Sequence, residues 1–583
     1  MTLSLSIPAA DSVATSTAAA VVVDLLVDAG VDAVFGVPGG AIEPLLDALA
    51  LAQGAGGPQI VIARHEAGAA FMADGYARET GRLGVCFATS GPGATNLLTG
   101  IACSHANEIP VLAITGQPAL SLHGRNALQE SGDTGIDVTA MFKHCTRYNT
   151  MVTDPLQAET KAIAAIGRAL QQPHGPTHLS VPVDVLRAPV ARRTGVLAFP
   201  GMVGGIGLPR SQAIDELAES LAAAERAVIV AGRGASQALR EIESISEMLA
   251  ATVVTTPDAK GLVDPQHEQV AGVIGFAGHA QALEAVAHAD LVLLVGSRVS
   301  EWTTAAWSAD LLGPKLIHVD ASAENLLLSP MSRQQVNGDP AVILAAVDAR
   351  LRQSREPASR RFRRLAPDVR ESVVRGVPGD LDPGAPVSPD RLMDVLSVQM
   401  PSDARLVADA GNATAWAIHC LDRPRGVERP LRHPWIDVLT EFAPMGWAIG
   451  ASVGMAAGEP SQQIVCLTGD GSWLMNGQEI TTAIQHELSV VFVILNDAAL
   501  GMVKHGQRLA GAQRVGYDLP EIDYAAIAQA MGCRAHVVGN VRDLDALDWQ
   551  SIFDPAGPVL LDVRIDAECV PPMALRLDTL NRA

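Results

Sequence analysis

The sequence is poor in aromatic and in charged residues, which make up 4% and 18% of its 583 residues. Hydrophobic residues account for 48%, so the chain can bury a large core, and a disordered protein is excluded. The scarcity of aromatics beside 53 glycines favours tight packing of helices on sheets. A chain of this length is too long for one core and suggests about three to four domains.

Paired cysteines, long apolar runs and a signal peptide are also missing. The seven cysteines show no Cys-x-x-Cys pairing of the metal-binding kind, so we expect free thiols in a reduced, cytoplasmic compartment. No apolar run reaches the roughly 18 residues that a membrane helix requires, which excludes a membrane partner. Residues 1–15 lack the basic start and apolar core of a signal peptide and are expected to form a flexible leader.

Basic clusters of the kind that bind nucleic acids are absent as well. The net charge is −21 and the pI is about 5.1, so we exclude a nucleic-acid partner. The overall charge does not attract anions, so an anionic substrate must be bound by individual polar or charged groups in its site. Seven arginines do lie between residues 352 and 370, but we interpret this Pro-containing run as a solvated linker.

The chain does contain a repeated alternation of helical segments with short apolar runs. Runs bounded by Gly and Pro predict buried parallel strands at 33–36, 85–88, 111–114, 177–181, 227–231, 252–255, 291–295 and 316–319. The predicted fold class is α/β, with three doubly wound parallel-sheet domains. We place these domains at 16–190, 205–351 and 387–575, with a linker at 352–386.

The most informative local pattern is Gly469-Asp470-Gly471-Ser472, followed by Asn496-Asp497. An apolar run precedes each motif and a helix-like stretch, 473–486, lies between them, which predicts a strand, a tight turn, a helix and a parallel strand. Both acidic residues then fall at the carboxyl ends of neighbouring strands. Glycine lets the backbone approach a phosphate, and two carboxylates can hold a hard divalent cation. The alternative is a surface turn with an unrelated Asn-Asp turn.

A second set of motifs lies far upstream. It consists of Arg64-His65-Glu66-Ala67-Gly68-Ala69-Ala70, Thr89-Ser90-Gly91-Pro92-Gly93-Ala94-Thr95-Asn96 and Gly116-Gln117-Pro118. Together with the Gly-Asp-Gly motif, these segments resemble thiamine diphosphate (ThDP) enzymes, and closely the catalytic large subunit of acetolactate (acetohydroxyacid) synthases. The resemblance runs from about residue 15 to about residue 575, with the motifs in the family's order. It implies pyrimidine-binding, central and diphosphate-binding domains.

The resemblance implies ThDP and Mg²⁺ as cofactors, held between the first domain of one subunit and the third domain of another. A homodimer or homotetramer is therefore expected. Glu66 would contact the aminopyrimidine ring and favour its imino tautomer, with Asn96 also in the cofactor site. Met445 would prop the cofactor in its bent form, and Met502 would contact it as well.

The same resemblance assigns the diphosphate to the turn Gly469-Asp470-Gly471-Ser472. Asp470, Asp497 and a backbone carbonyl near Ala499 would bind Mg²⁺. Asp497 is a departure, because the family usually has Asn at this position. A carboxylate is still a hard oxygen ligand, but its added negative charge predicts weaker cofactor retention.

For the reaction, the resemblance implies decarboxylation of a 2-oxo acid such as pyruvate and transfer of the acyl anion to an acceptor carbonyl. The organic chemistry belongs to the cofactor, whereas the protein orients the reactants and excludes water. Gln129 and Lys143 match residues that line the family's substrate channel. Gly39 and Gly40 would face the reacting centre and keep it uncrowded.

Two departures concern the acceptor. Trp302 stands where acetolactate synthases have an Arg that holds the acceptor's carboxylate, and such a bond is worth roughly 1.5–3 kcal/mol. Gly506 stands where the family narrows the pocket with a Trp. Unless Arg298 or Lys143 substitutes, we expect an uncharged, larger acceptor: an aldehyde, ketone or keto-sugar.

Other functions stay open at this point. They are an ordinary acetolactate synthase that makes 2-acetolactate, a 2-oxo acid decarboxylase or acyl-anion oxidase, and a non-catalytic homologue. No adjacent His-His pair suggests a decarboxylase. A non-catalytic homologue is disfavoured because Glu66, Asp470 and Asp497 are all present.

Flavin binding is the remaining expectation for the central domain. Many relatives bind FAD there without using its redox chemistry, and Gly232, Arg233, Arg298 and Asp320 lie where flavin contacts would be expected. Gly-rich turns after strands are common, so each is a weak signal. The stretches around Gly278 and Trp302 depart from the flavin-binding pattern, so FAD is left as a possible cofactor.

Overall fold

The computed structural model describes residues 15–191, 193, 195–199, 209–353, 382–421, 433–554 and 556–573. The expected leader at 1–15, apart from Thr15, and most of the expected linker at 352–386 lie outside these residues. The chain divides into two compact units, Met1–Gly204 and Gly205–Ala583, which are described separately. The domain boundaries inferred from the sequence stay predictions.

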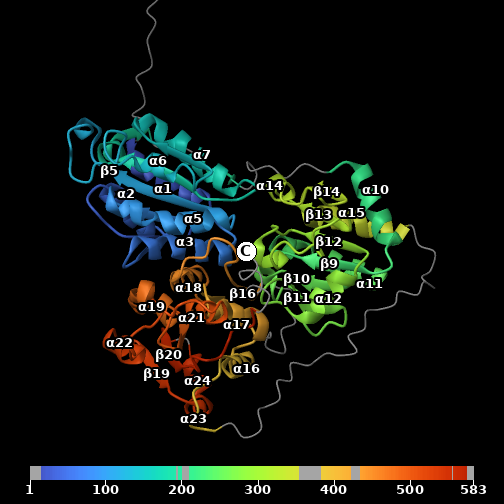
Figure 1. Cartoon of the computed structure of the whole chain (residues 1–583). Helices are drawn as coiled ribbons and strands as arrows, with labels where there is room; N and C mark the ends of the chain where they lie inside the picture. Colours follow the sequence, from blue (N-terminus) through green and yellow to red (C-terminus); the bar gives the residue numbers. More distant parts are fainter. Residues whose placement is uncertain are drawn as a thin grey trace, which may run out of the picture. The chain divides into compact units, whose positions relative to one another are not determined.

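The first unit, coloured blue to cyan in Figure 1, is built on a six-stranded parallel sheet with the order β3-β2-β4-β5-β7-β6. Its strands are β2 (Ala33–Gly36), β3 (Gln59–Ile62), β4 (Gly84–Ala88), β5 (Val111–Gln117), β6 (Tyr148–Met151) and β7 (Thr177–Pro182). The short strands β1 (Thr15–Thr17) and β8 (Pro189–Ala191) form an antiparallel pair. Its α-helices are α1 (Ala18–Asp28), α2 (Glu43–Gly54), α3 (Glu66–Thr80), α4 (Pro92–Asn96), α5 (Leu98–Ala106), α6 (Val138–Phe142), α7 (Ala158–Leu170) and α8 (Val183–Arg187).

Helix α3 shows how local sequence fixes an element of this unit. It begins after His65, whose side chain accepts a hydrogen bond from the Ala67 amide, and it ends at Gly81 in the left-handed conformation (φ 69°). Both ends are therefore capped. Its buried face carries the Asp74–Arg78 ion pair, at 2.6 Å, and Asp74 also accepts from Ser104 at 2.8 Å. Pairing of this kind lets charged groups be buried.

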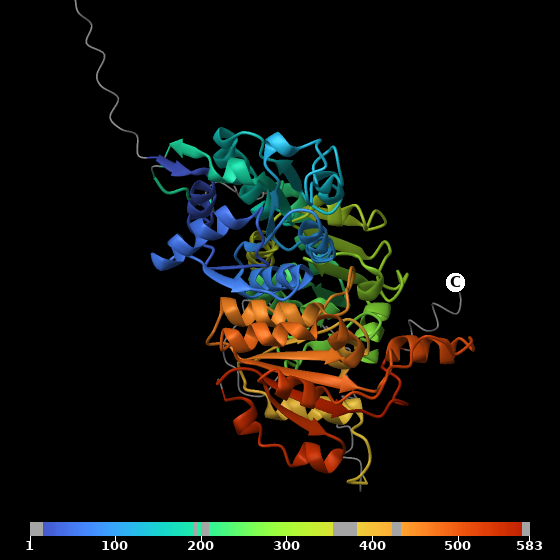
Figure 2. The same cartoon turned by 90° about the vertical axis from the view of Figure 1, so that its left-hand side faces the viewer.

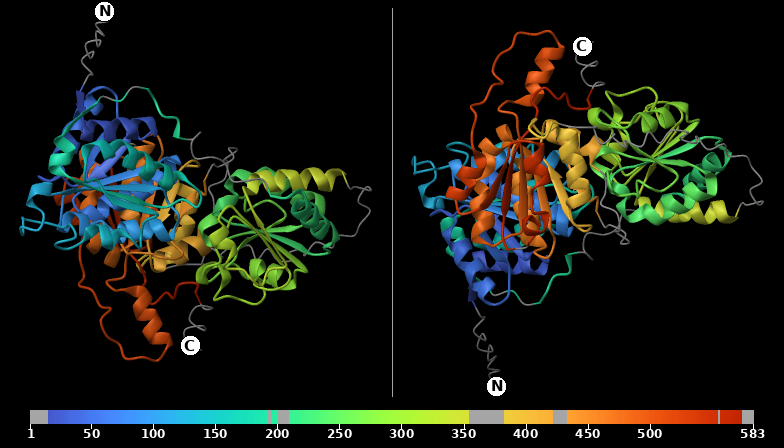
Figure 3. Two further views of the ribbon diagram at one scale, coloured as in Figure 1. Left: turned by 90° about the horizontal axis from the view of Figure 1, so that it is seen from above. Right: turned by 90° about the horizontal axis from the view of Figure 1, so that it is seen from below.

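The second unit contains two further parallel sheets. The central sheet has the order β11-β10-β9-β12-β13-β14 and is seen with helices on both faces in Figure 3. Its strands are β9 (Ala227–Ala231), β10 (Thr252–Thr255), β11 (Val270–Val273), β12 (Leu291–Val295), β13 (Leu316–Asp320) and β14 (Gln334–Asn337). Its α-helices are α10 (Ser211–Ala223), α11 (Leu239–Leu249), α12 (Ala280–His288), α13 (Glu301–Thr304), α14 (Ala323–Leu326) and α15 (Pro340–Gln353).

The C-terminal sheet has the order β16-β15-β17-β18-β20-β19, and Figure 2 shows helices along both of its faces. Its strands are β15 (Arg405–Ala408), β16 (Ile436–Asp437), β17 (Ile464–Gly469), β18 (Val490–Asn496), β19 (Arg534–Val538) and β20 (Val559–Arg564). Its α-helices are α16 (Pro389–Gln399), α17 (Asn412–Cys420), α18 (Trp447–Gly458), α19 (Asp470–Asn476), α20 (Ile480–Gln485), α21 (Gly501–Leu509), α22 (Tyr524–Ala530), α23 (Val541–Asp545) and α24 (Trp549–Ile552). The predicted α/β class with three parallel-sheet domains is confirmed.

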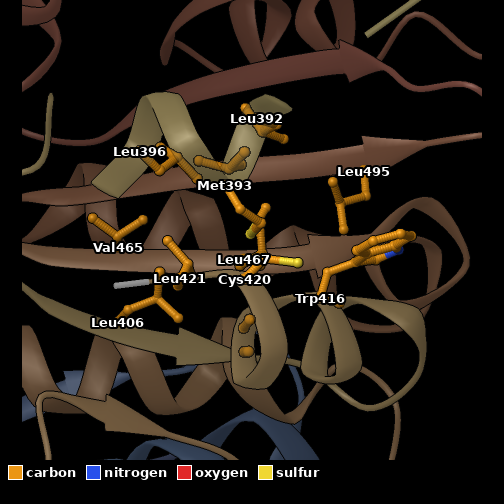
Figure 4. Packing of buried hydrophobic residues seen from close by; sticks show 14 of the residues in the cluster. Leu392, Met393, Leu396, Leu406, Trp416, Cys420, Leu421, Val465, Leu467 and Leu495 are labelled. Atoms are coloured by element: carbon orange, nitrogen blue, oxygen red, sulfur yellow. The ribbon is translucent and has the colours of Figure 1, made fainter. Parts of the chain in front are cut away.

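The core of the C-terminal sheet explains why its strands read as continuous apolar runs. Side chains of α16 and α17 cover one face, where Leu396 and Trp416 pack near Leu467 of β17 (Figure 4). Helix α18 has no charged residue, and its residues 447–457 are buried. Because helices cover both faces, strand residues on either side are buried.

Within the second unit, specific contacts join the central and C-terminal domains. The ammonium of Lys260, which is 7% exposed, donates to the carbonyls of Ala417 and Ile418 at 3.1 and 2.6 Å. Gly261 has a φ of 85°, and a Cβ there would lie 1.9 Å from Cδ1 of Trp435. Only glycine allows this approach. A larger residue at this position would push the Trp435 ring away and disturb the contact between the two domains.

The helix expected at 473–486 differs from the observed structure. Helix α19 begins three residues earlier, at Asp470, and ends at Asn476, a 3₁₀ turn follows, and α20 continues to Gln485. The break occurs where the Asn476 amide donates to the Gly446 carbonyl at 3.1 Å and where Trp473 lies over Gly477. Glycine is a weak helix former, so these tertiary contacts can divide the helix.

No helix among the described residues is long and apolar enough to cross a membrane.

Candidate functional site

The turn after β17 and the turn after β18 bring two carboxylates together. The strands are parallel neighbours, with Gly469 opposite Leu495. Asp470 therefore begins α19 directly beside Asp497, as the sequence pattern predicts. Asp470 is 2% exposed; its Oδ1 accepts from the Gly471 amide at 2.7 Å, and its buried Oδ2 has no hydrogen-bond partner within the described chain. A buried, unpartnered carboxylate oxygen is costly and points to a missing ligand.

The electrostatics of this pair favour a cation. Burial, followed by the neighbouring Asp497 carboxylate, raises the pKa of Asp470 to about 7. Burial raises the pKa of Asp497 to about 6. The described residues contain no cluster of three or more His, Cys, Asp or Glu side chains that could hold a metal, so a cation here would take other ligands from the backbone or from a bound phosphate. Two carboxylates are hard oxygen ligands of the kind that Mg²⁺ prefers, so these residues fit that cation.

A glycine cradle adjoins the carboxylates. A Cβ on Gly471 would lie 2.6 Å from Cδ2 of Leu500 and 3.2 Å from Cε of Met445, so Met445 and Gly471 are neighbours. A Cβ on Gly469 would meet no atom within 4 Å, so that side of the turn is open. Ser472 is 1% exposed in the first turn of α19. The predicted diphosphate residues thus share one turn at a helix start.

The chain after Asp497 turns sharply to reach α21. Ala498 has a φ of 50°, and its carbonyl accepts from the Leu519 amide at 2.8 Å. Ala499 is 5% exposed and pairs with Asp518 in an isolated bridge. Met502 packs against the C-terminal core. Ala499 and Met502 therefore belong to the segment that leads directly from Asp497 into α21.

Two further residues belong to this site, and we did not predict them from the sequence. Asp409 is fully buried and accepts hydrogen bonds from the Thr468 hydroxyl at 2.9 Å and the Gly446 amide at 3.0 Å. Burial raises its pKa to about 6. Because Thr468 leads into Asp470 and Gly446 follows Met445, Asp409 fixes these two parts of the site together.

Asn412, the first residue of α17, is the second such residue. A Cβ on Gly501 would lie 2.6 Å both from Nδ2 of Asn412 and from Oδ2 of Asp497, so the two side chains converge there. Oδ1 of Asn412 is buried with no hydrogen-bond partner in the described chain. The signal was available in the sequence, because Asp409-Ala410-Gly411-Asn412 also joins an apolar strand to a helix through glycine.

In the first unit, Glu66 is the first residue of α3 and meets α4. Its Oε2 accepts a hydrogen bond from Nδ2 of Asn96 at 2.9 Å, and a Cβ on Gly93 would lie 3.3 Å from its Oε1. The glycine therefore leaves room for the carboxylate. The structure brings together Glu66 and Asn96, two predicted site residues that are 30 positions apart.

The other predicted residues of this unit are more scattered. Gln129 has a φ of 58° and lies over Gly91, at 3.0 Å from the position of a Cβ there, which places it near α4. Gly39 packs against Thr89, whereas Gly40 has open space around it. Lys143 is exposed at the end of α6, which contacts β6 and β7 at the sheet edge opposite β3. The structure shows no contact between Lys143 and the Glu66 cluster.

The residues expected to contact a flavin do lie at one edge of the central sheet. Gly232 follows β9, Arg298 follows β12 and Asp320 ends β13, and these strands are adjacent. Their side chains are already engaged, however. Arg298 pairs with Glu441 at 3.0 Å, and the buried Asp320 accepts from the Ser322 amide at 2.7 Å.

Arg233 and the glycines of this edge are engaged as well. Arg233 pairs with the buried Asp437 at 2.9 Å. The Gly234 amide donates to the Gly296 carbonyl at 2.8 Å, and a Cβ on Gly232 would lie 2.4 Å from that same carbonyl oxygen. These glycines bring two loops into contact and leave no room for a pyrophosphate between them. The residues therefore do not fit a flavin, and we derive no step through one.

Comparisons with known proteins bear on this arrangement. Three family models match: the N-terminal TPP binding domain, the central domain and the C-terminal TPP binding domain of thiamine pyrophosphate enzymes, over residues 16–137, 214–347 and 409–563. An acetolactate synthase of Arthrospira platensis is 31% identical over 96% of each chain. The acetolactate synthase isozyme 2 large subunit of Escherichia coli K12 is 31% identical over 95% of this chain and 97% of its own.

Two other matches extend the comparison. A relative from Pseudomonas aeruginosa, named as a 2-ketoarginine decarboxylase, is 33% identical over 94% of each chain. A solved structure from Mycobacterium smegmatis, described as a thiamin diphosphate-dependent enzyme, matches with a TM-score of 0.77 over 94% of this chain and 99% of its own. At 24% identity, the latter shows the fold alone.

Proposed function

The chain belongs to the thiamine pyrophosphate enzymes, with acetolactate synthases among its full-length relatives, and we propose that it is a ThDP- and Mg²⁺-dependent carboligase. It decarboxylates a 2-oxo acid such as pyruvate and transfers the acyl unit to an acceptor carbonyl compound that carries no carboxylate. The observation that carries the acceptor proposal is the Arg298–Glu441 ion pair beside Trp302.

The residues of the C-terminal domain would hold the cofactor's charged end. The amides at the start of α19 would donate to the diphosphate, and Asp470, Asp497 and the Ala499 carbonyl would hold Mg²⁺. A cation there would offset the burial and the Asp497 repulsion that together raise the pKa of Asp470. Met445, held beside Gly471, would support the ring end of the cofactor, together with Met502.

When bound, ThDP supplies the nucleophilic carbon and the electron sink for decarboxylation. Glu66 holds the proton that is exchanged with the aminopyrimidine ring, and Asn96 orients the Glu66 carboxylate through their 2.9 Å bond. We propose that Glu66 of one subunit serves the diphosphate site of another, in a homodimer or homotetramer. Gln129 and Gly40 border the reactants, and Gly39 keeps the approach beside Thr89 narrow.

The acceptor is proposed from the charges around Trp302. The family's carboxylate-binding Arg is replaced by Trp302, whose ring packs edge-on against Phe276 with centroids 6.0 Å apart. Arg298, the nearest candidate substitute, is engaged by Glu441. An acceptor carboxylate would therefore compete with Glu441, and burying it without a partner is costly.

The proposed function is tested with the purified protein, ThDP, Mg²⁺ and pyruvate, alone and with a panel of aldehydes and ketones. We expect CO₂ release to rise when a neutral acceptor is consumed, and mass spectrometry to identify the coupled product. Formation of 2-acetolactate from pyruvate alone, at the same rate, would instead identify an ordinary acetolactate synthase.

A 2-oxo acid decarboxylase is the second candidate. It is favoured by the Pseudomonas aeruginosa relative named as a decarboxylase, which is 33% identical to this chain. In that case, CO₂ release would match aldehyde release from a 2-oxo acid and would not respond to any acceptor. The same product analysis therefore separates the two candidates.

Gly506→Trp is expected to narrow the range of acceptors. Gly506 lies on α21, and a Cβ there meets no atom within 4 Å, so an indole can enter the open space without displacing backbone. Helix α21 is held in place by Lys504 and Arg508, which pair with Glu568 at 3.0 and 2.6 Å. We expect the largest acceptors to lose about tenfold or more in kcat/KM relative to small ones, on the scale of one to three kcal/mol for pocket fit.

Gly506→Ala is the matched control for that substitution. It adds helix propensity, worth up to about 1 kcal/mol, but no bulk, so it should preserve the acceptor profile. An unchanged profile in Gly506→Trp would show that this position does not border the acceptor.

A further inference from the structure

A cavity of about 380 Å³ lies in the second unit, where the loop after β12 faces the loop that precedes Met445. Its lining includes Arg298, Glu301, Trp302, Thr440 and Glu441. Arg298 is the one cationic side chain in that lining. Its charge therefore decides whether the cavity can receive an anion.

One segment of the chain links the cavity to the candidate cofactor site. Thr440 and Glu441 belong to the segment that leads within five residues to Met445, and the methyl group of Met445 lies against the Gly471 turn. Trp302 packs on the same C-terminal core as Met502. The same core therefore supports one wall of the cavity and one residue of the candidate cofactor site.

Glu441 neutralises the cation of this cavity. Its Oε2 lies 3.0 Å from a terminal nitrogen of Arg298, and the two side chains are 38% (Arg298) and 24% (Glu441) exposed, so a ligand can reach the pair. Glu301 is a second carboxylate in the same lining, so the cavity has two acidic side chains and one cation.

We infer that Glu441 is a specificity-determining residue, which withholds Arg298 from substrate carboxylates and so excludes a second 2-oxo acid as acceptor. This inference rests on the proposed function, because it concerns the acceptor of that reaction. A carboxylate entering the cavity has to displace Glu441 from Arg298 while facing Glu301. A neutral carbonyl compound meets no such competition.

The inference is tested in the holoenzyme with ThDP and Mg²⁺, by calorimetric titration of butanoate and of its neutral counterpart butanamide. In Glu441→Gln, which keeps the side-chain size, butanoate should bind roughly tenfold or more tightly than in the parent, on the scale of one charge-assisted bond. Butanamide affinity should change little. Adding Arg298→Gln should remove the gain, because the released guanidinium is its source.

Glu301→Gln is the matched control, since Glu301 lines the same cavity but has no ion-pair partner within the described chain. It removes the same charge without releasing Arg298, so its gain for butanoate should be much smaller. Equal gains in Glu301→Gln and Glu441→Gln, or a gain that survives Arg298→Gln, would overturn the inference. Trp302→Arg provides an independent cation and should also tighten butanoate binding if the cavity is the acceptor site.

A turnover assay separates this inference from the proposed function. If the inference holds, Glu441→Gln makes more 2-acetolactate from pyruvate alone, relative to the product with a neutral acceptor. Butanoate could bind more tightly to Glu441→Gln than to Glu301→Gln or the parent, while no variant releases CO₂ in a ThDP-dependent way. That result would support the role of Glu441 and refute the carboligase. CO₂ release and product coupling, with a butanoate affinity that Glu441→Gln leaves unaltered, would support the carboligase and refute the role of Glu441.

Discussion

Replacement of Glu66 by Gln is expected to lower ThDP-dependent CO₂ release by at least about a hundredfold, the usual contribution of a positioned acid or base. Glu66 begins α3 and accepts a hydrogen bond from Asn96 at 2.9 Å, so its carboxylate is held in one orientation. Glutamine keeps the size of the side chain but cannot exchange a proton. Glu66→Ala should have an effect at least as large, because it also removes the contact with Asn96.

Folding and assembly provide the controls for this prediction. Both Glu66 variants should keep the parent's oligomeric state and unfolding temperature, measured by gel filtration and thermal melts. Glu43→Gln removes a surface carboxylate of the same unit that pairs with Arg187 at 3.5 Å, both side chains being over 60% exposed; turnover should stay within about twofold. Turnover of Glu66→Gln close to that of the parent would refute the proton-exchange role.

The strands could be predicted because the same physical constraint acts along their whole length. In β17 and β18 nearly every residue is buried, since helices cover both faces of the sheet, and such strands appear as apolar runs ended by polar turns. The Gly469-Asp470-Gly471 turn and the Asn496-Asp497 turn mark those ends. Their proximity follows from parallel pairing alone, so the carboxylate pair was predictable too.

Asn412 could have been predicted, because Asp409-Ala410-Gly411-Asn412 repeats the strand–glycine–helix pattern of the Asp470 turn, whereas the role of Asp409 depends on contacts that no local pattern encodes. Asp409 is identified as part of the site only through its bond to Thr468, 59 positions away. Its apolar flanks look the same whether or not such a partner exists. The division of the helix at Asn476 similarly depends on a bond to Gly446, 30 positions away, which overrides the local preference for one longer helix.

The pairing of Arg298 also depends on a residue that is distant in sequence. The sequence shows Trp302 in place of the family's Arg, and leaves Arg298 as a possible substitute. In the proposed function, the ion pair with Glu441 argues against Arg298 as that substitute, but Glu441 lies in a different domain and in no recognisable motif. Lys143, the other candidate substitute, is exposed at the far edge of its own sheet and shows no contact that would bring it to the Glu66 cluster.

Asp470→Asn is expected to act in opposite directions on the free and the loaded protein. Asp470 is 2% exposed, its Oδ2 has no hydrogen-bond partner in the described chain, and it faces Asp497. Removing its charge relieves desolvation and repulsion, so the cofactor-free protein should unfold at a higher temperature. Removing a metal ligand should abolish most of the stabilisation that ThDP with Mg²⁺ adds to the parent, which is about 2.7 kcal/mol at a hundredfold excess over Kd.

The control for that substitution is Asp518→Asn, which changes an exposed aspartate that touches this turn only through its backbone bridge to Ala499. It should leave both unfolding temperatures near those of the parent. A loaded Asp470→Asn protein that is stabilised as strongly as the parent would contradict the proposed metal site.

The pH dependence of the cofactor-free protein follows from the same carboxylate. Its pKa is about 7 in the folded chain and 3.8 as the ordinary value, so between these values the folded state binds more protons than the unfolded one. The free energy of unfolding contributed by this group therefore falls as pH rises through that window, by about 1–4 kcal/mol in total. Thermal melts from pH 5 to pH 8 should show this decline in the parent and a weaker one in Asp470→Asn. Magnesium competes with the proton, so its affinity for the parent should rise over the same window, and a pH-independent affinity would show that Asp470 is not its ligand.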